Sequence, residues 1–232
     1  MFGLFRFDWT ILIILPGLFI SIWAQIKVST TYNKYSKVFT KRGITGAEAA
    51  RAILDANGLS YVKIERVRGH LTDHYDPRKN VIRLSDSVYG STSTAAVGVA
   101  AHEAGHAVQY SQDYFPIKIR GAVIPVSRFG SMLSIPLFFI GLIFYYEGLM
   151  LLGIILYGAV AFFQLVTLPV EFNASSRALR ALDGSGILAK DELSSAKKVL
   201  SAAAMTYVAA LLTSLLTLLR LLVLAGSRGN RR

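Results

Sequence analysis

The sequence predicts a multi-pass membrane protein of the α+β class, with about four transmembrane helices and a small domain that combines a short sheet with an H-E-x-x-H helix. Three observations support this fold class. The chain of 232 residues is 53% hydrophobic, which is too apolar for an ordinary soluble domain. Four apolar runs approach or exceed the length that crosses a bilayer. The more polar stretch after the first run contains His102-Glu103-Ala104-Gly105-His106.

The first apolar run, residues 9–26, is long enough for one span. Trp9 and Trp23 lie near its ends, as interfacial aromatic residues do. A cleaved signal peptide is the alternative, but Ile22-Trp23-Ala24 does not fit a small-x-small cleavage site, so we expect an uncleaved anchor. Basic residues follow the run and predict a cytoplasmic location for the next segment. They are Lys27, Lys34, Lys37, Lys41 and Arg42.

The segment after the anchor carries signals for one short helix and three strands. Thr45 and Glu48 form a capping box for a helix that ends before Gly58. The strands are predicted over 61–67, 71–75 and 80–84, with the turn Asp76-Pro77-Arg78-Lys79 between the last two. Residues 91–94 then offer N-caps for the next helix.

The last predicted strand comes shortly before the H-E-x-x-H helix. A strand in that place can pair with an extended peptide by edge addition. Val81, Ile82, Arg83 and Leu84 are therefore candidates for substrate binding. An ordinary strand inside the sheet is an equally good interpretation.

His102 and His106 lie four residues apart, so on a helix both imidazoles can face one metal ion. Zinc accepts such nitrogens at about 2.0–2.1 Å. Glu103 points aside and can reach a water at an open zinc position, where it would act as general base. This arrangement is used for metal-assisted peptide hydrolysis, and it predicts one zinc ion per chain. The absence of cysteine excludes thiolate ligands and disulfides.

Two histidines on a buried helix can also be satisfied core residues, and a pattern with three fixed positions also arises by chance. Three features favour the metal site. Two of the four histidines in the chain fall in this motif, with the glutamate between them. The flanking residues are small and apolar, as a buried metal helix requires, and a third ligand is available further along the chain.

Further apolar stretches follow the motif. Residues 115–128 mix basic and apolar residues, which is typical of an interfacial segment. Residues 129–146 and 149–168 are predicted spans joined by a tight turn. Residues 202–225 form the last run, either a span or a re-entrant helix, and Arg220 near its end is expected to snorkel.

Glu171 is the best candidate for a third ligand. Two predicted spans separate it from His106, which places both residues on the same face of the membrane. One span, or three, would have excluded it. Asp183, Asp191 and Glu192 belong to the same face in a more polar setting and are weaker candidates. The alternative for Glu171 is an exposed interfacial carboxylate.

Over nearly its whole length the chain resembles the YugP-type membrane zinc metallopeptidases, also called neutral zinc metallopeptidase family 2. The resemblance rests on GHLTDHYDP (69–77), VIRLS (81–85), HEAGH (102–106) and LPVEFNAS (168–175). The chain is also distantly similar to the HtpX-type membrane proteases, which are gluzincins and hold zinc through two histidines and a glutamate from a later helix.

This resemblance implies a gluzincin-like zinc-protease domain, with His102, His106 and Glu171 as zinc ligands and Glu103 as general base. The chain departs from the family's pattern at Asn173, where the family usually has Asp. Asparagine keeps the capacity for hydrogen bonding and loses the charge.

The other two histidines, His70 and His74, would share one face of a strand. His74 could stabilise the oxyanion of the tetrahedral intermediate. The alternatives are a turn network with Asp73 and Asp76, which we favour, and a second metal site. Arg177 is another candidate oxyanion donor, or else it binds lipid headgroups or an acidic side chain.

These observations predict an integral membrane zinc endopeptidase, with protein or peptide substrates that include membrane proteins. A non-catalytic zinc-binding scaffold is the alternative, although a structural zinc site has no use for Glu103. The net charge of +11 lies beside apolar runs. It therefore indicates the anionic headgroups of the lipid bilayer as a partner, and not nucleic acid.

The expected organisation has five parts along the chain. They are an N-terminal transmembrane anchor over 1–26, a catalytic domain on the cytoplasmic face over 27–128, a transmembrane hairpin over 129–168, a third-ligand helix and loop on the catalytic face over 169–201, and a C-terminal transmembrane or re-entrant helix with a basic tail over 202–232.

Overall fold

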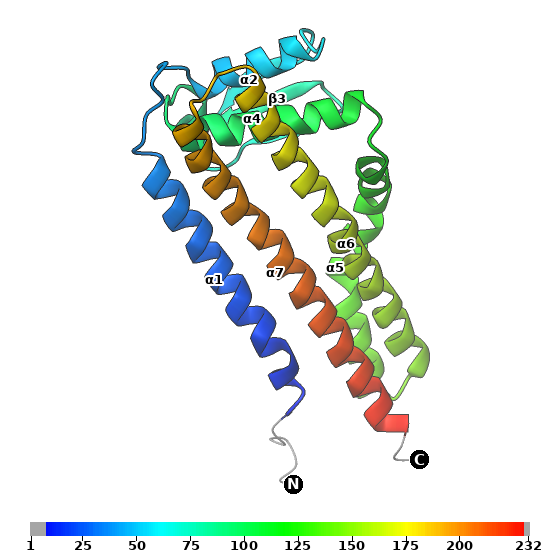
Figure 1. Ribbon diagram of the computed structural model, residues 1–232. Helices are drawn as coiled ribbons and strands as arrows, with labels where there is room; N and C mark the ends of the chain where they lie inside the picture. The colour runs from blue at the N-terminus through cyan, green and yellow to red at the C-terminus, as the bar shows by residue number, and fades with distance from the viewer. Residues whose placement is uncertain (1–7, 230–232) are drawn as a thin grey trace. The chain divides into compact units, whose positions relative to one another are not determined.

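The computed structural model describes residues 8–229, so the start of the expected anchor, together with Arg231 and Arg232 of the expected basic tail, lies outside them. Four of the described helices are long and apolar enough to cross a membrane, in agreement with the expected number. They are α1 (Ile11–Tyr35), α5 (Phe115–Ile143), α6 (Glu147–Gly184) and α7 (Lys190–Gly229), and Figure 1 shows their course.

The chain forms two compact units. One, which we call the site unit, comprises Ala24–Lys118 and Pro169–Thr206. The other, the apolar unit, comprises the chain up to Trp23, Ile119–Leu168 and the chain from Tyr207 onward. Each of the four long helices contributes residues to both units.

Local signals in the site unit act as the sequence predicts. Helix α2 (Gly46–Ala56) starts at the N-cap Thr45, whose side chain accepts from the Glu48 amide while the Glu48 carboxylate accepts from the Thr45 amide. Gly58 follows the helix at φ +72°, a conformation that costs glycine little. Ser93 caps helix α4 (Thr94–Ser111) by accepting from the Ala96 amide at 3.2 Å.

Three strands form one sheet in the order β1-β3-β2. Strand β1 (Lys63–Val67) pairs with β3 (Val81–Ser85) in parallel, and β2 (His74–Asp76) pairs with β3 in antiparallel fashion. The edge position expected for Val81–Leu84 is therefore wrong. Strand β3 is central, and the backbone of Val81, Ile82 and Arg83 is paired on both sides, so it is not available to an incoming peptide.

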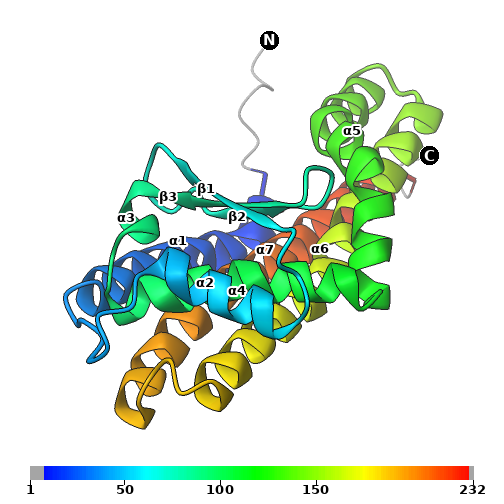
Figure 2. The ribbon, with the colours of Figure 1, turned by 90° about the horizontal axis from the view of Figure 1, so that it is seen from above.

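The core of the site unit surrounds α4. Figure 2 shows α2 running alongside α4, with the strands of the sheet next to them. Ile82 and Leu84 of β3, Leu54 of α2 and Leu182 of α6 are fully buried in one hydrophobic cluster with the alanines of α4. The short helix α3 (Asp86–Tyr89) adds the buried Val88 to this cluster. This packing fixes the position of the helix that carries the H-E-x-x-H motif.

The helices of the apolar unit show where the segments expected from the sequence begin and end, and two of those segments differ from the expectation. The stretch expected at the interface over 115–128 and the span after it form the single helix α5, which Pro125 and Pro136 do not interrupt. The turn before α6 comes earlier than expected, because α6 already starts at Glu147. The last apolar run, for which a span and a re-entrant helix were both expected, belongs to the single helix α7.

Arg220 in the apolar unit has a partner inside the protein. Its Nη2 lies 2.8 Å from Asp8 Oδ2, and its Nε donates to Thr10 Oγ1 at 3.1 Å. The side chain of Arg220 is only 17% exposed. It therefore forms an ion pair near the end of an apolar run, instead of only snorkelling as the sequence suggested.

Candidate metal centre

His102 and His106 lie on one face of α4, as their spacing predicts. Their rings meet edge to face with centroids 4.7 Å apart. Both Nε2 atoms are directed at the same carboxylate oxygen, Glu171 Oε2, at 3.2 Å from His102 and 3.5 Å from His106. Glu171 comes from α6 and is only 2% exposed. The ligand atoms of the three residues all lie within 4.8 Å of one another.

This geometry fits a tetrahedral metal ion. Zinc bonds of about 2.0–2.1 Å at tetrahedral angles separate neighbouring ligand atoms by about 3.3 Å. The two measured nitrogen-to-oxygen distances, 3.2 and 3.5 Å, are close to that separation. Two imidazoles and one carboxylate are a ligand set that suits zinc and leaves a fourth position open. The residues present therefore fit zinc.

Helix α4 can approach α6 closely because residue 105 is glycine. A Cβ atom at Gly105 would lie 2.7 Å from the carbonyl oxygen of Ala174, well inside van der Waals contact. Gly105 lies between the two histidines, and Ala174 lies one turn after Glu171. The glycine therefore allows the two ligand-bearing helices to meet at the site.

Glu103 directly follows His102 on α4 and is 8% exposed. Burial raises the pKa of its carboxyl to about 7, the His102 charge opposes this rise, and the charges of Glu171 and Asp73 add to it. A hydrogen bond from the Tyr75 backbone of β2 also favours the ionised form. A carboxyl with a pKa near neutrality can both accept and return a proton, which is what a general base and acid requires.

Each histidine also has a partner at its second ring nitrogen. His102 Nδ1 lies 3.1 Å from Ser175 Oγ on α6, and His106 Nδ1 lies 3.0 Å from Gln109 Oε1 on α4. Ser175 and Gln109 are not among the residues that the sequence predicted for the site. Their spacing was the available signal, since Ser175 is four residues after Glu171 and Gln109 is three residues after His106.

The weaker candidates for the third ligand have other partners. Glu192 accepts hydrogen bonds from the amides of Lys41 and Ala189, at 2.6 and 2.7 Å. Asp191 forms an exposed ion pair with Lys41 at 2.9 Å. Neither belongs to the group around the histidines of α4, so Glu171 is the carboxylate that the fold brings to them.

His70 and His74 do not lie side by side on a strand, because His70 precedes β2. His70 packs edge-on against Tyr32, and His74 Nδ1 contacts the Thr72 carbonyl at 2.9 Å. Among the described residues, the group around Glu171 is the one set of three or more metal-ligating side chains, and it includes neither histidine.

The favoured turn network is present around β2. Asp73 accepts from the Ser85 amide at 2.7 Å and from its hydroxyl at 3.0 Å. Asp76 accepts from the Arg78 amide at 3.0 Å, as an Asx turn requires. The Asp73 contacts link the start of β2 to the end of β3, and the Asp76 contact stabilises the turn between the two strands.

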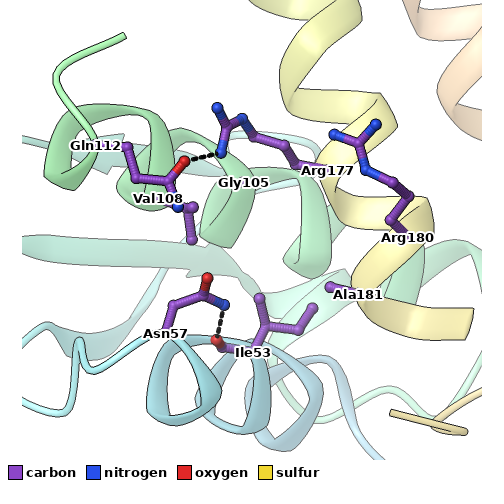
Figure 3. Close-up of a pocket in the computed structure, with 8 residues that line it drawn as sticks. All are labelled: Ile53, Asn57, Gly105, Val108, Gln112, Arg177, Arg180 and Ala181. Carbon is purple, nitrogen blue, oxygen red and sulfur yellow. Dashed lines mark hydrogen bonds between the residues drawn. The ribbon is translucent and has the colours of Figure 1, made fainter. Parts of the chain in front are cut away.

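Arg177 contacts Asn173 and Gln112 and does not contact the three ligands directly. Together with Arg180, Asn57 and several apolar residues it lines a pocket of about 280 Å³, and Figure 3 shows its guanidinium bonded to Gln112. The guanidinium also lies over the ring of Tyr114, 5.8 Å from its centroid.

Two histidines of an H-E-x-x-H helix, grouped with a buried glutamate from a later helix, form an arrangement that is typical of zinc metallopeptidases. Residues 10–226 match the sequence model of the family described as "Putative neutral zinc metallopeptidase", and the chain belongs to that family. The chain is 50% identical over 214 residues to "Putative membrane protease YugP" of Bacillus subtilis (strain 168), which covers 92% of this chain and 95% of that protein. No solved structure matches the chain significantly. The family expected from the sequence is therefore confirmed.

Proposed function

We propose that this protein is an integral membrane, zinc-dependent endopeptidase of the gluzincin type, with one zinc ion held by His102, His106 and Glu171. The observation that carries this proposal is the convergence of both Nε2 atoms on Glu171 Oε2 at tetrahedral spacing, next to the buried Glu103. The family and the relative's name support the same conclusion.

When bound, zinc would supply Lewis acidity that polarises the scissile carbonyl and lowers the pKa of a coordinated water to about 7. Glu103 would accept a proton from the attacking water and return it to the leaving amine. Glu103 directly follows His102 on α4, and its side chain is buried. Hydrolysis then breaks the peptide C–N bond and adds the elements of water across it.

The strand that pairs with the substrate is β2 in this proposal. Unlike β3, strand β2 lies at an edge of the sheet, and its residue Tyr75 donates a backbone hydrogen bond to Glu103. An extended peptide added to this edge would pass the general base. His74 belongs to β2 and is exposed, so it remains our candidate donor to the oxyanion.

We place the site unit on the cytoplasmic face of the membrane. The basic residues after the first apolar run support this orientation through the positive-inside rule. A reporter fused in the loop 184–186, between α6 and α7, tests it. A cytoplasmic readout is expected there, and an extracellular readout would overturn the orientation.

Casein cleavage by detergent-purified protein tests the activity. Wild type and Glu103→Gln are compared at equal, measured zinc content. Cleavage by wild type alone supports the proposal, because the substitution removes the base and leaves all three ligands. Equal cleavage by both would show that Glu103 is not the base. Zinc binding without any cleavage of unfolded proteins or membrane-protein peptides would favour the non-catalytic scaffold.

A further inference from the structure

Gln109 contacts the second ring nitrogen of the candidate zinc ligand His106. It lies on α4 one turn after His106 and is fully buried, at 0% exposure. Its side-chain amide has three partners at short distances. They are His106 Nδ1 at 3.0 Å, the Val170 carbonyl at 2.8 Å and Asn173 Oδ1 at 2.9 Å.

The partners fix the orientation of this amide. The carbonyl oxygen of Val170 can only accept, so the atom of Gln109 that faces it must be the NH₂ group. The reversed amide would place two acceptor oxygens against each other at 2.8 Å. The oxygen Oε1 of Gln109 therefore faces His106 Nδ1, and since Oε1 has no proton to give, Nδ1 carries the proton of that hydrogen bond.

The contacts of Asn173 and Arg177 on α6 fix the orientation of the Asn173 amide in the same way. Arg177 Nε can only donate, so the atom of Asn173 that it contacts at 2.7 Å must be Oδ1. The same Oδ1 accepts from Gln109 Nε2, which gives the second proton of that NH₂ group a partner. Gln112 and the ring of Tyr114 in turn hold the guanidinium of Arg177, as Figure 3 shows for Gln112.

We propose that Gln109 is a positioning residue that holds His106 in the tautomer with the proton on Nδ1 and the lone pair on Nε2, and that Asn173 and Arg177 keep the Gln109 amide in the required orientation. The proposal rests on the proposed zinc site. The other tautomer would place a proton on the very nitrogen that must bind the ion.

His102 differs from His106 in this respect. Its Nδ1 faces the hydroxyl of Ser175, which can donate or accept, so that contact does not select a tautomer. Ser175→Ala is thus the matched control, because it also removes one contact to the second nitrogen of a zinc-ligating histidine.

The test measures zinc affinity by competition with a chromophoric chelator, using full-length protein in detergent, and measures the thermal stability of the zinc-free form. Gln109→Met keeps the length of the side chain and removes its hydrogen bonds. We expect its zinc dissociation constant to rise about 10- to 100-fold, and Ser175→Ala to cause a clearly smaller rise. We also expect the zinc-free form to unfold within a few degrees of wild type, which separates positioning from general destabilisation.

Gln109→Glu provides a second, independent arm. A carboxylate is a stronger acceptor for His106, but it would turn an oxygen toward the Val170 carbonyl and Asn173 Oδ1, so we expect weakened zinc binding. Wild-type affinity in Gln109→Met, or tighter binding in Gln109→Glu, would overturn the inference. Zinc binding by wild type keeps the proposed function in place in either case, whereas absence of zinc binding by wild type would remove the proposed function itself.

Discussion

Gly105 of α4 and Ala174 of α6 meet so closely that a Cβ on the glycine would lie 2.7 Å from the alanine's carbonyl oxygen. Ordinarily a Gly→Ala change inside a helix stabilises it by about 1 kcal/mol. Gly105→Ala should do the opposite and lower the free energy of unfolding by about 1–3 kcal/mol, because the two helices must separate. Zinc affinity should fall with it, since Glu171 belongs to α6.

Gly158→Ala is the control for this change. Like Gly105, Gly158 lies inside a helix, in this case α6, but a Cβ there would meet nothing within 4 Å. Gly158→Ala should therefore unfold at or slightly above the temperature of wild type, both with and without zinc, and should keep the wild-type zinc affinity. Equal behaviour of the two variants would show that the close approach at Gly105 does not matter for the site.

Glu171→Ala removes one of three proposed ligands and should weaken zinc binding by about 100-fold or more. Glu192→Ala is a comparison at another buried carboxylate, which caps backbone amides and does not belong to the group. It should cost about 1 kcal/mol of stability and leave zinc affinity unchanged. Metal analysis after gel filtration, with calorimetric titration of zinc-free protein, measures both. Full zinc occupancy in Glu171→Ala would contradict its assignment as a ligand.

Removal of zinc by a chelator should lower the unfolding temperature, because an ion that binds only the native state stabilises it. Zinc at about 100 times its dissociation constant contributes about 2.7 kcal/mol, which corresponds to about 5–10 °C for a chain of this length. The double variant His102→Ala, His106→Ala should show no chelator-dependent change. A chelator effect of the same size in that variant would place the stabilising ion elsewhere.

Asn173→Asp should leave zinc affinity within about threefold of wild type. An aspartate oxygen can accept from Gln109 Nε2 and Arg177 Nε just as Asn173 Oδ1 does, so the hydrogen bonds persist. Asn173→Leu removes this acceptor and should weaken zinc binding in the same direction as Gln109→Met. An unchanged zinc affinity in Asn173→Leu would show that Asn173 does not support the zinc site.

Asp8 and Arg220 form an ion pair of low exposure in the apolar unit. Breaking it from one side, as in Arg220→Leu, leaves the partly exposed Asp8 carboxylate unpaired and should cost about 1 kcal/mol. The double variant Asp8→Leu, Arg220→Leu should recover part of this loss, because no lone charge remains. Chemical or thermal unfolding of wild type, Asp8→Leu, Arg220→Leu and the double variant measures the coupling of the two residues in a double-mutant cycle. Additive losses would show that the pair is not coupled.

The sequence was sufficient to select His102, His106 and Glu171 as candidate ligands, and the fold groups them, because their signals are local or topological. The spacing of His102 and His106 follows from helix geometry, and Glu171 followed from counting apolar runs. Gln109 and Ser175 could not be assigned in the same way, since their roles depend on how α4 packs on α6. The order of three short strands is equally non-local, and so the sequence left open whether Val81–Leu84 forms an edge strand or, as β3 does, a central one. Runs of apolar residues likewise gave the number of long helices but not their ends, because neither Pro125 nor Pro136 ends α5.

The burial of α4, the helix that carries the histidines, affects how substitutions in it are interpreted. Helix α4 is buried around nearly its whole circumference, mostly through alanine and glycine, and 14 of its 18 residues are buried. Enlarging almost any of these side chains would overfill the core, whatever its distance from the metal. Loss of activity after a substitution in α4 therefore shows, in the first place, that a larger side chain does not fit into the core. A chemical role for a residue of α4 is established only by a variant that keeps the size of its side chain.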